Sequence, residues 1–484
     1  MAAVKLSEVK IDPVWAFKVP PAIALRRLAL PICAVDGRLA TAMADVTDAQ
    51  VIAAIETATG LKVEPLAANR DELRAALLEV YGDVRTLQSR PSVADDPVAA
   101  VDGLLRAAVL RGASDLHFDP VRDGLRVRMR IDGGLEDFAR FPAALAPALV
   151  SRLKVMASLD IAEKRAPQDG AFTWSMQQGS ARRAPFDIRV ATLPVRYGER
   201  VTLRLLEAGR DRLTLGALGM SGADREAFGK VLAHPHGLVL LTGPTGSGKT
   251  TTLYAAIRHL LDTAALNILT VEDPVEYDID GVMQAEVDSG DKVNFTKALR
   301  SLLRHDPDVI MIGEIRDAES LDTALKAALT GHLVLTTLHA NDAVSAVTRL
   351  LDMGMAPHKI GATLRVSAAQ RLARRLCPKC REAYLLDERE ALLLGRGDLA
   401  GKTAWRPRGC LACAGRGCAG RTGIFELMAP DSEISSMIAA GAREDELLPR
   451  LREKGMRTLA DDAVDKVLGG VTSVAEVFRT VGAV

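Results

Sequence analysis

A glycine-rich loop between an apolar run and a helical pattern constrains this chain most. Residues 243–250 read Gly-Pro-Thr-Gly-Ser-Gly-Lys-Thr and match G-x-x-x-x-G-K-[ST] at every fixed position. The apolar run 237–242 precedes the loop, and helical spacing follows it. Later apolar runs at 266–271, 309–312 and 333–338 are separated by helical stretches. This alternation predicts parallel βαβ units in one sheet, with a phosphate-binding loop after its first strand.

The loop predicts how a nucleotide is held. Its glycines let backbone N–H groups curl around phosphate oxygens, and the following helix N-terminus adds partial positive charge. We expect Lys249 to reach the β- and γ-phosphates of ATP and the Thr250 hydroxyl to ligate Mg²⁺. The predicted nucleotide-contacting residues are Gly243, Pro244, Thr245, Gly246, Ser247, Gly248, Lys249, Thr250 and Thr251. A chance match in a Gly-rich turn is the alternative, and the strand and helix flanks argue against it.

Two acidic positions follow predicted strands. Glu272 opens the string Glu-Asp-Pro-Val-Glu after one apolar run, and Glu314 comes directly after the run 309–313. Ligands of open parallel sheets bind at the carboxyl ends of strands, so both side chains should face the phosphate loop. We expect Glu314 to polarise the attacking water and Glu272 to assist or to contact Mg²⁺. The alternative for either residue alone is a solvated charge at a strand end.

Five of the six cysteines lie between positions 377 and 418. Cys377 and Cys380 form one Cys-x-x-Cys knuckle, and Cys410 and Cys413 form a second. Four thiolates predict a closed, structural Zn²⁺ site, with free thiols or a redox pair as the alternative. Cys418 should be a spare thiol. A basic run beside the first knuckle could meet anionic lipid, or it could be a solvated face; it comprises Arg371, Arg374, Arg375, Lys379 and Arg381.

Composition limits the remaining classes. With 484 residues the chain is too long for one hydrophobic core, so several domains are expected. Lys plus Arg and Asp plus Glu both number 62, and this balance argues against constitutive nucleic-acid binding. The N-terminus lacks the pattern of a signal peptide, and no stretch looks able to span a bilayer. We therefore expect a cytoplasmic protein without a transmembrane segment.

The patterns divide the chain into an α/β multidomain protein. Asp48 is a predicted N-cap for a helix over 49–59. Residues 148–162 also have helical spacing, and Pro147 just before them suits a helix start. Strict alternation of apolar and Arg residues over 125–131 predicts a strand with one buried face, and Asp132-Gly133 predicts a hairpin turn. The expected parts are an N-terminal α/β domain (1–85), a linker (86–97), an α+β domain (98–207), and an ATPase domain (213–484) that contains the cysteine module (377–423) and a helical tail (431–484).

Four strings together resemble the secretion and type IV pilus assembly ATPase family. They are the phosphate loop, the acidic box 272–277, the stretch 299–317, and the histidine box 330–339. Strings of the second domain, such as Pro167-Gln-Asp-Gly170, look similar to the family too. The resemblance implies a RecA-like core with a PAS-like α+β domain before it. It also implies a homohexameric ATPase that drives pilin-like subunits out of the inner membrane.

The resemblance adds further site residues. It implies that His339 senses the γ-phosphate or couples it to domain movement, whereas residue type alone suggests structural roles for His339 and His332. Ring ATPases complete their sites with arginines from a neighbour. The family implies Arg189, Arg204, Arg300, Arg304 and Arg316. Charge alone makes other arginines equal candidates, and a solvated arginine face is the alternative for each; these are Arg182, Arg183, Arg196 and Arg200.

The cysteine module and the short N-terminal domain resemble the type II secretion branch. That branch implies docking of residues 1–85 to an inner-membrane partner, action on a polytopic platform protein, and assembly of a pseudopilus for protein export. A type IV pilus assembly ATPase is the nearest alternative. A nucleic-acid translocase and a non-hydrolysing scaffold are the competitors from other classes. Some relatives bind cyclic dinucleotide through repeated Arg-Leu-Gly, but Arg27-Leu-Ala29 departs from that motif, so we do not expect this activity.

Overall fold

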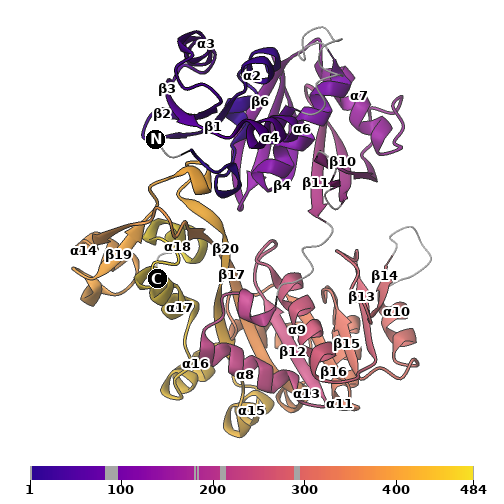
Figure 1. Cartoon of the computed structure of the whole chain (residues 1–484). Helices are drawn as coiled ribbons and strands as arrows, with labels where there is room; N and C mark the ends of the chain where they lie inside the picture. Colours follow the sequence, from indigo (N-terminus) through magenta and orange to yellow (C-terminus); the bar gives the residue numbers. More distant parts are fainter. Residues whose placement is uncertain are drawn as a thin grey trace. The chain divides into compact units, whose positions relative to one another are not determined.

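The computed structural model describes residues 3–81, 96–178, 181–182, 185–207, 214–287 and 295–482 (Figure 1). The predicted linker, residues 86–97, lies outside these residues except for Asp96 and Pro97. The chain forms two compact units: residues 1–209 with 377–382 and 407–420, and residues 210–376 with 383–406 and 421–484. The α/β multidomain class is confirmed. Among the described residues, no helix is both long and apolar enough to span a bilayer.

The N-terminal domain is a small three-stranded sheet with helices. Strand β2 pairs antiparallel with β1 and parallel with β3. The predicted Asp48 N-cap is confirmed, since its carboxylate accepts the Val51 N–H at 3.1 Å. The elements are η1 (Leu6–Glu8), α1 (Pro13–Ala16), α2 (Pro21–Arg27), β1 (Ala29–Val35), β2 (Arg38–Met43), α3 (Ala49–Thr59), β3 (Lys62–Ala67) and α4 (Arg70–Tyr81).

The second domain is an antiparallel sheet in the order β6-β5-β4-β11-β10-β7. In β5 the apolar residues are buried and the arginines partly exposed, as the alternation predicts. Asp132 and Gly133 both have positive φ, which confirms the predicted hairpin turn. The elements are α6 (Pro97–Arg111), β4 (Ala113–Val121), β5 (Gly124–Ile131), β6 (Gly134–Pro142), α7 (Ala146–Met156), β7 (Gln168–Trp174), β8 (Gln177–Gln178), β9 (Ala181–Arg182), β10 (Phe186–Val195) and β11 (Gly198–Glu207).

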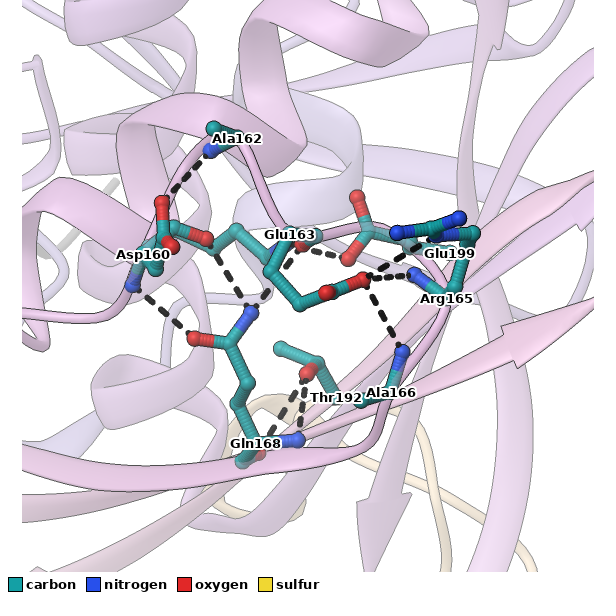
Figure 2. Close-up of polar contacts among 9 residues, drawn as sticks. Asp160, Ala162, Glu163, Arg165, Ala166, Gln168, Thr192 and Glu199 are labelled. Atoms are coloured by element: carbon teal, nitrogen blue, oxygen red, sulfur yellow. Dashed lines mark hydrogen bonds and ion pairs between the residues drawn. The ribbon is translucent and has the colours of Figure 1, made fainter.

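Helical spacing in the sequence continues to Ala162, but α7 ends at Met156. The residues after it form a loop whose backbone groups are held by side chains. The Gln168 amide accepts the Asp160 N–H at 2.9 Å and donates to the Asp160 and Glu163 carbonyls at 3.0 and 3.1 Å (Figure 2). Buried Lys154 donates to the Glu163 carbonyl at 2.6 Å and pairs with Glu199. These side-chain contacts replace the helical hydrogen bonds that the apolar spacing suggests.

The second unit contains a sheet in the order β14-β13-β15-β16-β12-β17-β20 (Figure 1). The pairs β12–β16, β12–β17, β13–β14, β13–β15 and β15–β16 are parallel, which confirms the predicted βαβ arrangement. The strands are β12 (Gly237–Thr242), β13 (Ile268–Glu272), β14 (Met283–Glu286), β15 (Val309–Ile312), β16 (Leu333–Leu338), β17 (Leu364–Leu376) and β20 (Cys418–Met428), and β18 (Glu382–Leu385) pairs with β19 (Thr403–Arg406) separately.

Helices cover both faces of this parallel sheet. In β12, Leu238 and Leu240 belong to one buried cluster, and Val239 and Leu241 to another. Both faces are therefore buried, which explains the unbroken apolar runs. The helical elements of this unit are η2 (Leu215–Ala217), α8 (Gly222–Leu232), α9 (Lys249–Thr263), α10 (Phe295–Leu302), α11 (Ala318–Leu329), α12 (Ser345–Asp352), α13 (Pro357–Thr363), α14 (Glu388–Leu393), η3 (Gly397–Leu399), α15 (Ser432–Ala439), α16 (Glu444–Glu453), α17 (Leu459–Leu468) and α18 (Val474–Val481). The short η4 (Leu411–Cys413) belongs to the first unit.

Candidate functional site

The glycine-rich loop connects the end of β12 to the start of α9. Gly248 is the N-cap of α9 with a φ of 90°, and Gly243 has a φ of 146°. A Cβ atom at Gly243 would lie 2.5 Å from the Gln370 carbonyl oxygen, so only glycine fits there. The loop therefore presents backbone N–H groups at the N-terminus of a long helix, which is an anion-binding arrangement.

Lys249 is the first residue of α9 and curls over this loop. Its ammonium donates to the Gly243 carbonyl at 2.7 Å and to the Pro244 carbonyl at 3.2 Å. Burial lowers the pKa of Lys249; the charge of Glu314 opposes this effect and that of Arg371 adds to it. The ammonium of Lys249 is thus held against two carbonyl groups of the glycine-rich loop.

Glu314, His339 and Arg316 meet at the carboxyl edge of the sheet. Glu314 follows β15 and His339 follows β16, and these strands are parallel neighbours. The His339 Nε2 lies 2.9 Å from Glu314 Oε1. The Arg316 guanidinium lies 3.3 Å from Glu314 Oε2 and 3.0 Å from Asp273 Oδ2. The structure thus brings together the predicted residues Glu314, His339 and Arg316. The charge of Glu314 also acts on the pKa of Lys249.

Glu272 ends β13 in a buried hydrogen-bond network. Its carboxylate accepts from the Tyr254 hydroxyl, from Thr270 Oγ1 at 2.6 Å and from Gln284 Nε2 at 3.0 Å. Only 2% of Glu272 is exposed. Burial and the neighbouring carboxylate raise the pKa of Tyr254, so this hydroxyl remains a donor at physiological pH. Protein donors thus hold Glu272 in place, whereas Glu314 is partly exposed.

The segment after His339 is tied down by three side chains, none of which the sequence singles out for this task. The Thr242 hydroxyl accepts the Ala340 N–H at 2.8 Å and donates to the Ala340 carbonyl at 3.0 Å. The Arg371 guanidinium donates to the Asn341 carbonyl at 2.6 Å. The buried Glu426 carboxylate accepts the Ala343 N–H at 2.7 Å. We call residues 340–343 the post-histidine segment. Its anchoring fixes the backbone that carries His339.

Gln370 and Arg371 lie beside the phosphate loop. The β12–β17 register pairs Thr242 with Ala369, so the next residues of β17 lie level with Gly243. Gln370 accepts the Thr252 hydroxyl of α9 at 2.8 Å. The sequence pattern assigns Arg371 to the basic run near the first knuckle, but the register places it beside the glycine-rich loop. Only knowledge that these two strands are neighbours could have revealed this position.

The remaining predicted arginines occupy two other places. Arg300 of α10 pairs with Glu319 at 2.8 Å, and Arg304 donates to the Arg300 carbonyl at 3.1 Å. Arg189 and Arg204 are opposite each other on β10 and β11 of the second domain, which belongs to the other compact unit. Arg204 also pairs with Asp115 at 3.0 Å.

Two of the arginines that charge alone suggests are also placed. Arg200 pairs with Asp119 at 3.0 Å, and the Arg196 guanidinium lies over the Tyr197 ring. Arg183 lies outside the described residues. The two histidines that flank β16 differ in surroundings. His332, at the start of the strand, contacts the Ala327 carbonyl at 3.0 Å, whereas His339 follows its end at the carboxylate cluster.

The two Cys-x-x-Cys knuckles come together into one four-sulfur group. The Sγ atoms of Cys377, Cys380, Cys410 and Cys413 all lie within 4.8 Å of one another. Three Sγ–Sγ distances are 3.8–3.9 Å. A tetrahedral zinc with Zn–S bonds of about 2.3 Å holds its sulfurs about 3.8 Å apart, so the group fits this metal. Backbone N–H groups also point at the sulfurs, as at thiolates; Gly417 donates to Cys413 Sγ at 3.2 Å.

A glycine-rich loop at the edge of a parallel sheet, with a lysine and a carboxylate-histidine pair beside it, defines a P-loop nucleotide-binding enzyme. Sequence comparison refines this class. The profile of the Type II/IV secretion system protein family matches residues 94–479, and that of the MshEN domain matches residues 1–87. The chain belongs to the Type II/IV secretion system protein family, and it is an ATP hydrolase.

Curated relatives cover most of the chain. Type II secretion system protein E of Pseudomonas aeruginosa is 48% identical over 84% of this chain and 79% of its own length. Type II secretion system ATPase E of Vibrio cholerae is 43% identical over 86% and 81%. The type IV pilus assembly ATPase PilB of Myxococcus xanthus is 38% identical over 98% and 88%.

Solved structures share the fold. The pilus retraction motor PilT with bound ADP superposes with a TM-score of 0.52 and 26% identity, over 78% of this chain and 95% of that chain. The ATPase DotB of Legionella pneumophila superposes with a TM-score of 0.58 over 80% and 96%, at 21% identity. The likeness to DotB is one of fold.

Proposed function

We propose that this chain is the ATPase of a type II secretion system and hydrolyses ATP to drive pseudopilus assembly and protein export. The observation that carries the proposal is the Glu314–His339 contact at the carboxyl ends of β15 and β16, next to β12 and the glycine-rich loop on which Lys249 folds back. Relatives with type II secretion names at 43–48% identity over most of the chain support this branch. Type IV pilus assembly is the second candidate, favoured by the PilB match over 98% of the chain.

In this proposal the described side chains have distinct tasks. Lys249 leaves its carbonyl partners and binds the β- and γ-phosphates. Thr250, with Glu272 assisting, would hold Mg²⁺, and the metal would supply positive charge that neutralises the phosphates. Glu314 orients the attacking water and accepts its proton. His339 responds to the γ-phosphate and passes this response on through the 2.9 Å contact between its Nε2 and Glu314 Oε1. Glu272, fixed by its three donors, supports the metal and water from β13.

The arginines complete the site in a ring of six copies. Phosphoryl transfer spreads negative charge over the γ-phosphate, and a neighbouring subunit's arginine stabilises that charge. Arg189, Arg204, Arg300 and Arg304 serve this role between copies, and Arg316 acts within its own chain beside Glu314. Arg204→Ala should abolish turnover in the assembled ring while nucleotide binding remains; retained turnover would remove Arg204 from this role.

The four-cysteine group holds a structural Zn²⁺. Its sulfur distances match a tetrahedral site, and four protein ligands leave no open coordination position for catalysis. Metal analysis of the purified chain checks this assignment: about one zinc per chain is expected, and none in a variant with all four cysteines changed to serine.

Residues 1–85 dock the motor to a protein of the inner membrane, and a polytopic platform protein receives the motion. Full-length chain with an affinity tag, incubated with solubilised inner membrane, tests this part. We expect capture of a single-span secretion protein with a large cytoplasmic domain. Capture of pilus assembly components instead would select the second candidate, and capture of neither would contradict the membrane-machine assignment.

A further inference from the structure

The two cysteine segments, residues 377–382 and 407–420, form one compact unit with the N-terminal part of the chain. From here on, we call these two segments together the knuckle, and it contains both Cys-x-x-Cys motifs. Ala414 is 7% exposed and belongs to the same buried cluster as Leu30, Ile32 and Leu39 of the N-terminal sheet. Leu411 packs against that cluster as well. The knuckle therefore contributes side chains to the N-terminal core.

Backbone contacts join the same two parts. The Lys10 N–H donates to the Leu411 carbonyl at 2.9 Å. Gly415 approaches β1 so closely that a Cβ atom there would lie 2.3 Å from the Ala34 carbonyl oxygen. Side chains at the margin add little, because the Arg408–Asp36 pair at 3.4 Å is exposed. The close approach at Gly415 and the buried apolar contacts therefore define the interface.

The atoms that make this interface lie inside or next to the second Cys-x-x-Cys. Leu411 lies between Cys410 and Cys413, and Gly415 comes two residues after the second of them. The Gly415 N–H donates to the Cys410 carbonyl at 2.9 Å. Segments this short have no apolar core of their own, so a metal bound to the four sulfurs would fix their shape.

We propose that the metal-closed knuckle is the docking surface for the N-terminal domain, so that metal loss releases this domain from it. Cys377 directly follows β17, and Cys418 begins β20. This docking holds whichever partner the N-terminal domain binds, so its test is independent of the secretion assignment.

Two glycines of the knuckle supply a matched pair of variants. Gly415 and Gly420 both have a φ of 75°, so alanine meets the same backbone strain at either position. A Cβ atom at Gly415 would strike Ala34, whereas at Gly420 it has nothing within 4 Å. Gly415→Ala should therefore disrupt docking, and Gly420→Ala reports the strain alone. Neither variant changes a sulfur ligand.

Docking can be measured by hydrogen exchange of the full-length chain with detection by mass spectrometry. The measured quantity is the exchange rate of the peptide that contains Lys10, whose N–H is bonded across the interface. We expect Gly415→Ala to speed exchange there by about tenfold or more relative to Gly420→Ala. Chelation of zinc from the wild-type chain should give the same increase. The peptide of the buried strand β2 serves as reference, since its protection shows that the N-terminal domain stays folded.

Each outcome decides the proposal. Faster exchange in Gly415→Ala with zinc retained supports docking through the knuckle surface. Faster exchange with zinc lost also supports it, because coupling between docking and metal binding is reciprocal. Equal exchange in Gly415→Ala and Gly420→Ala would overturn the docking surface. Unchanged exchange at Lys10 after complete zinc removal would overturn the role of the metal.

Discussion

Thr242→Val should loosen the post-histidine segment and slow catalysis without weakening nucleotide binding. The Thr242 side chain is fully buried at the end of β12, and its hydroxyl makes two hydrogen bonds to Ala340. Valine has nearly the same shape but lacks the hydroxyl, so the Ala340 N–H and carbonyl lose their partner. Because this backbone carries His339, its displacement separates the imidazole from Glu314.

The size of the effect follows from the two bonds lost. Each neutral hydrogen bond contributes about 0.5–1.5 kcal/mol net, so the segment should be destabilised by about 1–3 kcal/mol. At about 1.4 kcal/mol per factor of ten, its open population should rise roughly 5- to 150-fold. Hydrogen exchange at the Ala340 amide measures this change directly. Steady-state kinetics should show a lower kcat, and equilibrium binding titrations should show an almost unchanged Kd for ATP.

Thr336→Val is the matched control. Thr336 is equally buried, lies level with Leu240 of the adjacent strand, and its hydroxyl has no hydrogen-bond partner in the part of the chain that the structure describes. The same substitution there should leave stability and turnover unchanged or slightly raised. Equal exchange at Ala340 in wild type and Thr242→Val, or equal damage from both variants, would refute the reasoning.

Further predictions concern buried charges. Lys154→Met leaves Glu199 buried without its cation and should lower the unfolding free energy by about 3–5 kcal/mol, and adding Glu199→Gln should restore part of the lost thermal stability. Burial lowers the pKa of Lys249, so the midpoint of the fall in ATP affinity with rising pH should lie below the ordinary lysine value of about 10.4, because only the ammonium binds phosphate. Binding titrations over a range of pH measure this midpoint. Arg371→Met removes a cation that helps to lower the pKa of Lys249, so the fall in ATP affinity should move to higher pH. An unchanged pH dependence would contradict the role of Lys249 in holding phosphate.

Features set by local sequence could be predicted. Asp48 caps its helix because the cap needs only a carboxylate three residues before an N–H group. The strand 125–131 follows from side-chain alternation, and the phosphate loop from a motif with correct flanks. Parallel strands also put Glu272 and Glu314 at one edge of the sheet, because the carboxyl ends of parallel strands share that edge.

Features that depend on contacts between distant parts of the chain could not be predicted from the sequence. The position of Arg371 depends on the β12–β17 register, which no local pattern reveals. The end of α7 depends on Gln168, which holds the following loop through its side chain (Figure 2). It also depends on Lys154, which donates to the Glu163 carbonyl. Sequence order assigns the knuckle to the ATPase domain, but its contacts group it with the N-terminal part, because Ala414 finds its apolar neighbours there. The predicted catalytic roles of individual residues stay predictions.

Steady-state ATP turnover by wild type and Glu314→Gln, with nucleotide binding measured on the same samples, tests the central claim most directly. Glutamine keeps the shape and most contacts but cannot accept a proton, and a general base typically contributes about 10²–10⁴-fold. Glu226→Gln on α8, an exposed glutamate paired with Lys230, is the control. We predict at least about a hundredfold lower kcat for Glu314→Gln with ATP still bound. Equal turnover by wild type and Glu314→Gln would contradict the account.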